Sequence, residues 1–79
     1  MDQGIRDLRA RSETLEALLV SIGSPRLRML GIDVPTPFAQ PEHRLYELLA
    51  ADDADAAHSR YNALIRRLVS YERAAAAVS

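Results

Sequence analysis

Two long stripes of apolar side chains dominate the pattern of the chain. Over residues 4–22, apolar positions recur every three or four residues: Ile5, Leu8, Leu15, Leu18, Leu19 and Ile22. Over residues 54–77, steps of four and three alternate: Ala57, Tyr61, Leu64, Leu68, Tyr71 and Ala75. Both spacings place the apolar side chains on one side of an α-helix. They predict a long helix over each range, with Ser12 as a small residue at a close helix crossing.

Gly and Pro residues mark the predicted helix ends between the two stripes. Gly23 is expected to end the first helix, because glycine adopts the left-handed conformation after a helix at almost no cost. Ser24 and Pro25 are typical of an N-cap followed by the first helical residue. They predict a second, short helix over residues 25–30, which Gly31 closes.

Residues 32–40 have a different character from the stripes. Pro35 and Pro37 each fix a backbone φ angle and bias the preceding residue towards an extended conformation. We therefore expect an ordered, extended connector here. Phe38 is the only Phe of the chain. Its ring is expected to anchor the core, and a role in a ligand pocket or an interface is the alternative.

The remaining signals complete an all-α fold. Pro41 predicts the start of a third helix over residues 41–51, and an acidic turn then leads into the last helix. No segment has the period of a β-strand, so we expect a single domain over residues 1–79, a small helical bundle of two long and two short helices. The last helix would be about 35 Å long, which is more than the third helix can cover. Formation of a homodimer is expected to complete the bundle.

Composition and charge narrow the possible functions. The formal net charge is −1, which argues against a nucleic-acid-binding module. The absence of Cys excludes disulfides and cysteine-ligated zinc. No apolar run approaches the ~20 residues that cross a bilayer, so we expect a soluble, cytoplasmic protein without a membrane partner. All ten Lys or Arg residues are Arg and Ala is abundant, which is typical of a bacterial genome rich in G and C.

Polar residues of the third and fourth predicted helices form the candidate ligand site. His43 and Glu47 are four residues apart, so one helix face holds both and they could share a proton or a ligand. An antiparallel hairpin would bring His58 and Asn62 close to them, with Arg44 beside them. The alternative is that these side chains simply face solvent. Neither a metal ion, a cofactor nor a catalytic residue is expected.

The apolar and basic faces suggest contacts with proteins. The residues predicted for an interface, with core packing as the alternative, are Phe38, Tyr61, Leu64, Leu68 and Tyr71. The outer face of the last predicted helix is basic and carries Arg60, Arg66, Arg67 and Arg73. That face is interpreted as solvated, with an acidic protein partner or a phosphate as the alternative.

Two segments carry a family resemblance. Residues 18–28, LLVSIGSPRLR, contain a helix that ends in Gly and a Pro-Arg-Leu helix start. Residues 42–44, Glu-His-Arg, precede the acidic turn and helix start at residues 50–57, AADDADAA. Both resemble the C-terminal effector-binding (FCD) domain of GntR-type bacterial transcription regulators, and the stretch from residue 18 to residue 57 that contains them is a little over half of the chain. The resemblance implies a helical, self-associating regulatory module that binds a small effector.

The metal site of that family is not carried over by the resemblance. His43 matches one ligand position of the family. The positions that correspond to other ligands hold Arg11 and Leu15 in the first predicted helix, and Leu64 or Ile65 in the last. The connector also takes the place of a further long helix. The resemblance therefore implies a shortened relative without the metal site.

Two other functions stay open at this point. The order of Leu-Arg-Ala-Arg at residues 8–11, Pro-Glu-His-Arg at residues 41–44 and a long last helix resembles the small helical chorismate mutases. Such an enzyme would need Arg11, Arg28 and Arg44 to converge on a dicarboxylate. We nevertheless expect a protein that is not an enzyme.

The other alternative is an accessory or adaptor subunit. It would bind another protein through residues 34–38 of the connector. In that case a stretch of exposed apolar surface should surround Phe38 in the isolated chain.

Overall fold

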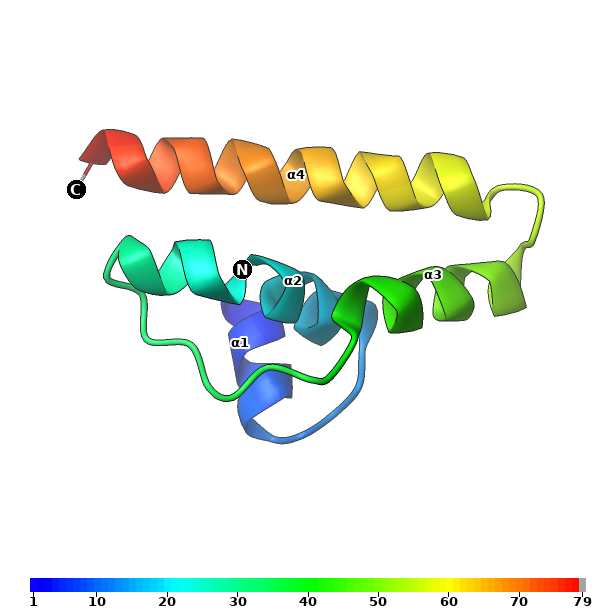
Figure 1. Cartoon of the computed structure of the whole chain (residues 1–79), viewed down its shortest axis with the longest axis horizontal. Helices are drawn as coiled ribbons and strands as arrows, with labels where there is room; N and C mark the ends of the chain where they lie inside the picture. Colours follow the sequence, from blue (N-terminus) through cyan, green and yellow to red (C-terminus); the bar gives the residue numbers. More distant parts are fainter. Residues whose placement is uncertain (79) are drawn as a thin grey trace.

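The structure, a computed structural model, describes residues 1–78 and contains four α-helices and no strand in that range (Figure 1). The helices are α1 (Asp2–Arg9), α2 (Leu15–Met29), α3 (Pro41–Asp52) and α4 (Ala57–Val78). The expected all-α class is confirmed, with two longer and two shorter helices. The third and fourth helices lie close to their predicted ranges, and the first two helices are divided differently.

The first predicted helix, over residues 4–22, is two helices. α1 ends because Arg11 adopts a left-handed conformation with φ of 60°. The N–H of Arg11 then donates to the carbonyl of Leu8, and the N–H of Ser12 donates to that of Asp7, which closes the helix in a Schellman motif. Thr14 starts α2, because its hydroxyl accepts a hydrogen bond of 3.1 Å from the N–H of Ala17.

The predicted break at Gly23 and the predicted helix start at Pro25 are wrong. α2 runs through both residues and ends at Met29. A proline inside a helix typically costs about 3 kcal/mol because one backbone hydrogen bond is lost. Packing outweighs this cost, since α2 is buried on several sides by the other helices. Gly31, with φ of 86°, ends α2 as the sequence predicts.

Gly4 and Gly23 allow the close approach of helices. A Cβ atom on Gly4 in α1 would lie 2.5 Å from the carbonyl oxygen of Glu16 in α2. A Cβ atom on Gly23 in α2 would lie 2.8 Å from Cδ1 of Leu68 in α4. Gly23 is therefore a packing residue at a helix crossing, and the helix does not end there. Ser12, which the sequence placed at such a crossing, is exposed in the turn between α1 and α2.

α2 lies at the centre of the molecule. α4 runs along one side, α2 and α3 follow one another beneath it, and α1 crosses α2 on the side away from α4 (Figure 1). One core cluster joins α2 to α3 and α4: Leu18, Leu19, Leu45, Leu49, Ala57 and Leu68. The other joins α2 to α1 and the connector: Leu8, Ala17, Val20, Leu27 and Val34. Both clusters share α2, so this helix holds the two halves together.

The connector is extended, as predicted, and is fixed to α2. The hydroxyl of Ser21 accepts a hydrogen bond of 3.1 Å from the N–H of Phe38 and donates one of 2.9 Å to the carbonyl of Ala17. Gln40, with φ of 49°, precedes α3, and Pro41 occupies its first turn as expected. In the acidic turn before α4, the carboxylate of Asp53 accepts hydrogen bonds from two backbone N–H groups.

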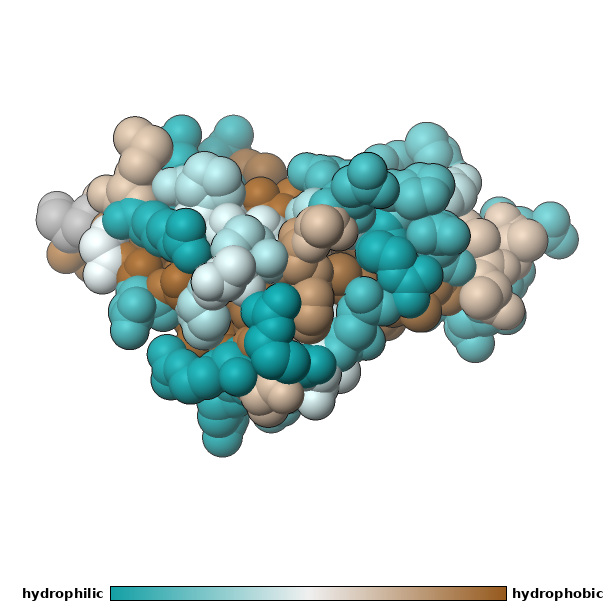
Figure 2. Space-filling view, turned by 60° about the horizontal axis from the view of Figure 1, so that its bottom comes forward, coloured by the Kyte–Doolittle hydropathy of each residue, from teal (hydrophilic) through white to brown (hydrophobic). Residues whose placement is uncertain are grey.

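The apolar stripe of α4 faces the rest of the chain, as predicted. Of the 22 residues of α4, only Ala57 and Leu68 are buried. The other large side chains of the stripe are half-buried and pack at the edges of the core: Tyr61, Leu64 and Tyr71. The longest helix therefore buries no more residues than the shorter α1 or α3. Figure 2 shows another face of the molecule, where hydrophilic side chains cover most of the surface and hydrophobic ones appear between them.

Candidate functional site

The four residues predicted for a polar cluster on α3 and α4 form two separate pairs. Nε2 of His43 lies 3.5 Å from Oε1 of Glu47 on α3, and both side chains are largely exposed. Nδ2 of Asn62 lies 3.3 Å from Nε2 of His58 on α4. No hydrogen bond or ion pair joins the two pairs within residues 1–78, so the single site expected from these residues stays a prediction.

Arg44 connects α3 to the turn that precedes α2. Its guanidinium donates to the carboxylate of Glu13 through Nε and Nη2, and Nη1 lies 3.5 Å from Glu47. The hydrogen bond from Arg44 is the main cause that lowers the pKa of Glu13 below its usual value of 4.5; loss of solvation opposes it, and the charge of Arg44 adds a smaller lowering effect. The same pair raises the pKa of Arg44. Arg44 thus acts as a clamp between segments, and its charge is already compensated.

The Glu13–Arg44 pair gives a pH-dependent prediction. A carboxyl whose pKa is lowered on folding stabilises the folded chain above its unfolded pKa, and this contribution disappears as the pH falls through the folded pKa. Arg44→Gln is expected to return the pKa of Glu13 towards 4.5. The measurement is an NMR titration of the Glu13 side-chain carboxyl carbon. Arg66→Gln is the control, and an unchanged Glu13 pKa in Arg44→Gln contradicts the prediction.

The three arginines of the chorismate-mutase hypothesis are each bound by acceptors of the chain itself. Nη1 of Arg11 donates to the carbonyl of Thr36 at 2.6 Å. Arg28 donates to the carbonyls of Val34 and Pro35 at 3.0 and 3.1 Å. Arg44 is held by carboxylates, and none of the three lines either hollow described below. Within residues 1–78, each of the three guanidiniums thus already has a carbonyl or carboxylate partner in the chain.

The connector does not display the exposed apolar surface that an adaptor would need. The side chain of Val34 is buried in the core. Phe38 is half-buried between both core clusters, and the guanidinium of Arg11 covers its ring at 4.4 Å from the centroid. Phe38 therefore anchors the core, as expected, and Arg11 gains a cation–π contact that helps to hold its left-handed backbone.

The tyrosines and leucines predicted for an interface belong mainly to the chain's own packing. The rings of Tyr46 and Tyr61 are 5.8 Å apart and tilted, where α3 meets α4. Burial, and then the charge of Glu42, raises the pKa of Tyr61. Leu68 is only 3% exposed and packs in the core. Of the two alternatives, the burial of Leu68 favours core packing.

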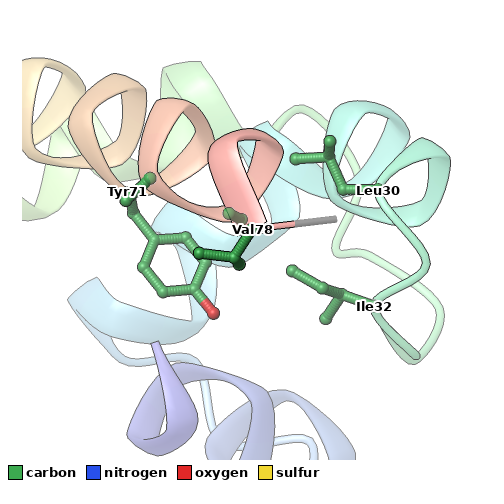
Figure 3. Close-up of a pocket in the computed structure, with 6 residues that line it drawn as sticks. Leu30, Ile32, Tyr71 and Val78 are labelled. Atoms are coloured by element: carbon green, nitrogen blue, oxygen red, sulfur yellow. The ribbon is translucent and has the colours of Figure 1, made fainter.

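An open apolar groove lies where the ends of α2 and α4 meet, and Tyr71 is the one lining residue that the sequence had suggested for an interface. Its volume is about 530 Å³, and it is lined by Leu30, Ile32, Tyr71, Ala74, Ala75 and Val78. Leu30 and Ile32 lie on one side, Tyr71 on the other and Val78 between them (Figure 3). Val78 is 87% exposed, and the neighbouring Met29 is 82% exposed. The groove thus combines a hollow with protruding apolar side chains.

Other surface features carry less chemistry. A second open hollow of about 410 Å³ lies on α1 beside Asp2, Ile5 and Arg6. On the predicted basic face of α4, Arg60 pairs with Asp52 at 2.7 Å and Arg67 pairs with Glu16 at 2.5 Å. Two of the four arginines of this face are therefore paired with the chain's own carboxylates.

Comparison of the chain with protein-family models, curated proteins and solved structures gives no match. Among residues 1–78, no group of three or more His, Cys, Asp or Glu side chains is placed to hold a metal ion. None of the helices in that range is both long and apolar enough to span a membrane. The groove between the ends of α2 and α4 is thus the principal candidate site.

Proposed function

We propose that the chain is a non-enzymatic helical module that self-associates and serves in regulation. The observation that carries the proposal is the incomplete cover of α4. This helix is about 33 Å long and buries only Ala57 and Leu68. Its Tyr71, Ala75 and Val78 end at an open apolar groove.

The physical reason to expect self-association is that exposing apolar surface to water is unfavourable. Removing apolar area from water contributes roughly 25 cal/mol per Å², and a chain of this size has little stability to spare. A second copy would cover the end of α4 and add to that stability. Homodimers with two-fold symmetry are the commonest way to close such a surface.

A regulatory role is supported by the resemblance of residues 18–28, 42–44 and 50–57 to the FCD effector-binding domain. The groove volume of about 530 Å³ lies within the range of small-molecule sites, roughly 300–1,000 Å³. Besides a second copy of the chain, a small apolar effector is therefore a candidate to bind in the groove. Native mass spectrometry of the purified protein would detect it as a co-purifying mass.

Self-association predicts a mass that rises with concentration. Interfaces of less than about 1,200 Å² are weak, so the measurement should cover a wide range of protein concentration, from about 1 to 500 µM. Sedimentation equilibrium over this range is expected to give an average mass that rises from the chain mass of 8.8 kDa towards twice that mass. A constant mass of 8.8 kDa over the whole range contradicts the proposal.

A further inference from the structure

We propose that Met29 is a reversible oxidation site of this chain: peroxides convert its thioether to a sulfoxide without disturbing the fold, and Arg26 binds the new oxygen. Met29 has no role in the function proposed above, so its oxidation does not depend on self-association. Three observations lead to this site: the exposure of Met29, its place at the end of α2, and an unpaired arginine one helical turn before it.

The sulfur of Met29 is open to reagents in solution. Met29 is the last residue of α2 and is 82% exposed. The chain has one other methionine, Met1, which is half-buried and packs against both core clusters. The chain has no Cys, so no thiol competes for an oxidant. Met29 is therefore the most accessible oxidisable sulfur of the chain.

The reaction is a two-electron oxygen transfer. A lone pair of the Met29 sulfur attacks one oxygen of hydrogen peroxide, so that an S–O bond forms and the O–O bond breaks. The departing hydroxide takes the proton of the new S–OH group and leaves as water. Sulfur loses two electrons and the peroxide gains them. A dithiol reverses the step through methionine sulfoxide reductase: the oxygen leaves as water and the dithiol becomes a disulfide.

Oxidation at this position leaves the packing of the chain intact. A sulfoxide disrupts a protein when it brings a polar group into a core or an apolar contact. Within residues 1–78, Met29 belongs to neither core cluster. The end of α2 is held by the backbone, because the N–H of Leu30 donates to the carbonyls of Arg26 and Leu27. The sulfoxide therefore forms on the folded chain, and the chain stays folded with it.

Arg26 is placed to bind the sulfoxide oxygen. Residues three apart on a helix are surface neighbours, and a long helical side chain lies over the turn that precedes it. The side chain of Met29 is thus directed towards Arg26, which is exposed and forms no ion pair within residues 1–78. A thioether sulfur is only a weak acceptor. The hydrogen bond from the guanidinium is therefore made only after oxidation, and it is assisted by charge.

The modification changes what the end of α2 presents to its surroundings. In the reduced chain this position carries a flexible, apolar and polarisable side chain. In the oxidised chain it carries a polar, chiral group that a positive charge holds in place. Met29 thus makes this surface sensitive to peroxide while the interior of the chain stays the same.

Peptide mapping by mass spectrometry tests the selectivity. The chain is treated with hydrogen peroxide at about 1 µM, a concentration at which weak interfaces stay open. We expect Met29 to be oxidised at least about threefold faster than Met1, since susceptibility follows exposure. In concentrated urea both side chains are exposed, and the two rates are expected to agree within about twofold. Equal rates in the folded chain, or a preference for Met29 that persists in urea, overturn the inference.

A second measurement tests whether the fold tolerates the sulfoxide and whether the step is reversible. The control is Met29→Leu, which nearly conserves the side-chain volume and is treated with peroxide in the same way. Relative to this control, oxidation of Met29 is expected to change Tm by less than about 4 °C, the size of a surface substitution in a small domain. Methionine sulfoxide reductases for both sulfoxide epimers, with a dithiol, are expected to remove the oxygen. A larger loss of Tm, or a Met29 sulfoxide that resists both enzymes, overturns the inference.

NMR of the arginine side chains tests the contact with Arg26. The signal of the Arg26 Nε–H group is expected to shift when Met29 is oxidised. Arg66 on α4 is the matched control, because it is also exposed and forms no ion pair within residues 1–78. Its signal is expected to stay in place. An unchanged Arg26 signal, or an equal shift in Arg66, overturns the contact between Arg26 and the sulfoxide.

Discussion

Gly4→Ala is expected to lower the free energy of unfolding by about 2 kcal/mol, within the range of overpacking in a tight interior. The new Cβ atom would lie 2.5 Å from the carbonyl oxygen of Glu16 and 2.6 Å from Cγ2 of Val20. The Glu16 oxygen belongs to the backbone of α2, so α1 itself must move away. Thermal unfolding followed by circular dichroism is expected to show a Tm lower by roughly 8–16 °C, since about 4–8 °C accompany each kcal/mol in small domains.

Gly23→Ala is the matched control for this substitution. A Cβ atom on Gly23 would meet Cδ1 of Leu68 at 2.8 Å, and this is the far end of a side chain that can shift. Ala also gains up to about 1 kcal/mol of helix propensity over Gly, which offsets the contact. We expect a change of less than about 1 kcal/mol. If Gly4→Ala and Gly23→Ala lowered the free energy of unfolding equally, the expectation that a clash with backbone destabilises more than a clash with a side chain would be contradicted.

Leu68→Ala is expected to lower the free energy of unfolding by about 3 kcal/mol, within the range of about 2–5 kcal/mol for truncation of a buried leucine. Leu68 is the only large side chain of α4 that is fully inside the core, and it packs on Gly23 in α2. Its loss leaves a cavity at the point that attaches α4 to the rest of the chain. The core of a domain of this size supplies a total free energy of unfolding of roughly 3–5 kcal/mol. Urea unfolding is therefore expected to find the variant barely folded.

Leu64→Ala on the same stripe is the control. Leu64 is only half-buried, so about half of that loss is expected. Because Leu68 packs inside one chain, its effect is also expected to be independent of protein concentration. Two results would contradict the placement of Leu68 in the chain's own core. One is a decrease in the free energy of unfolding that is the same for Leu68→Ala and Leu64→Ala. The other is a decrease for Leu68→Ala that changes with protein concentration.

The helical stripe of α4 is the part of the fold that the sequence predicted best. The steps of four and three from Ala57 to Ala75 describe the less exposed side of α4. This works because a helix that lies along the surface must divide its residues between core and water, and the division leaves a period in the sequence. The ends of α3 were also predictable, since Pro41 and the acidic turn act locally.

The candidate site was not predictable in the same way. His43 and Glu47 do pair, because four residues on one helix are neighbours whatever surrounds them. His58 and Asn62 pair within α4 for the same reason. The groove joins residues from two helix ends that are about 40 positions apart. Nothing in the local pattern of Leu30 or Val78 marks them as neighbours.

The sequence by itself determined the class, the position of α3 and α4 and the inner side of α4, because each depends on residues close to one another in the chain. Only the tertiary structure decided the division of the first half. The local sequence at Gly23 and Pro25 predicts the end of a helix, yet α2 continues through both residues. The free energy of burying α2 among α1, α3 and α4 exceeds the local cost of a proline in a helix, and that burial exists only once the chain has folded.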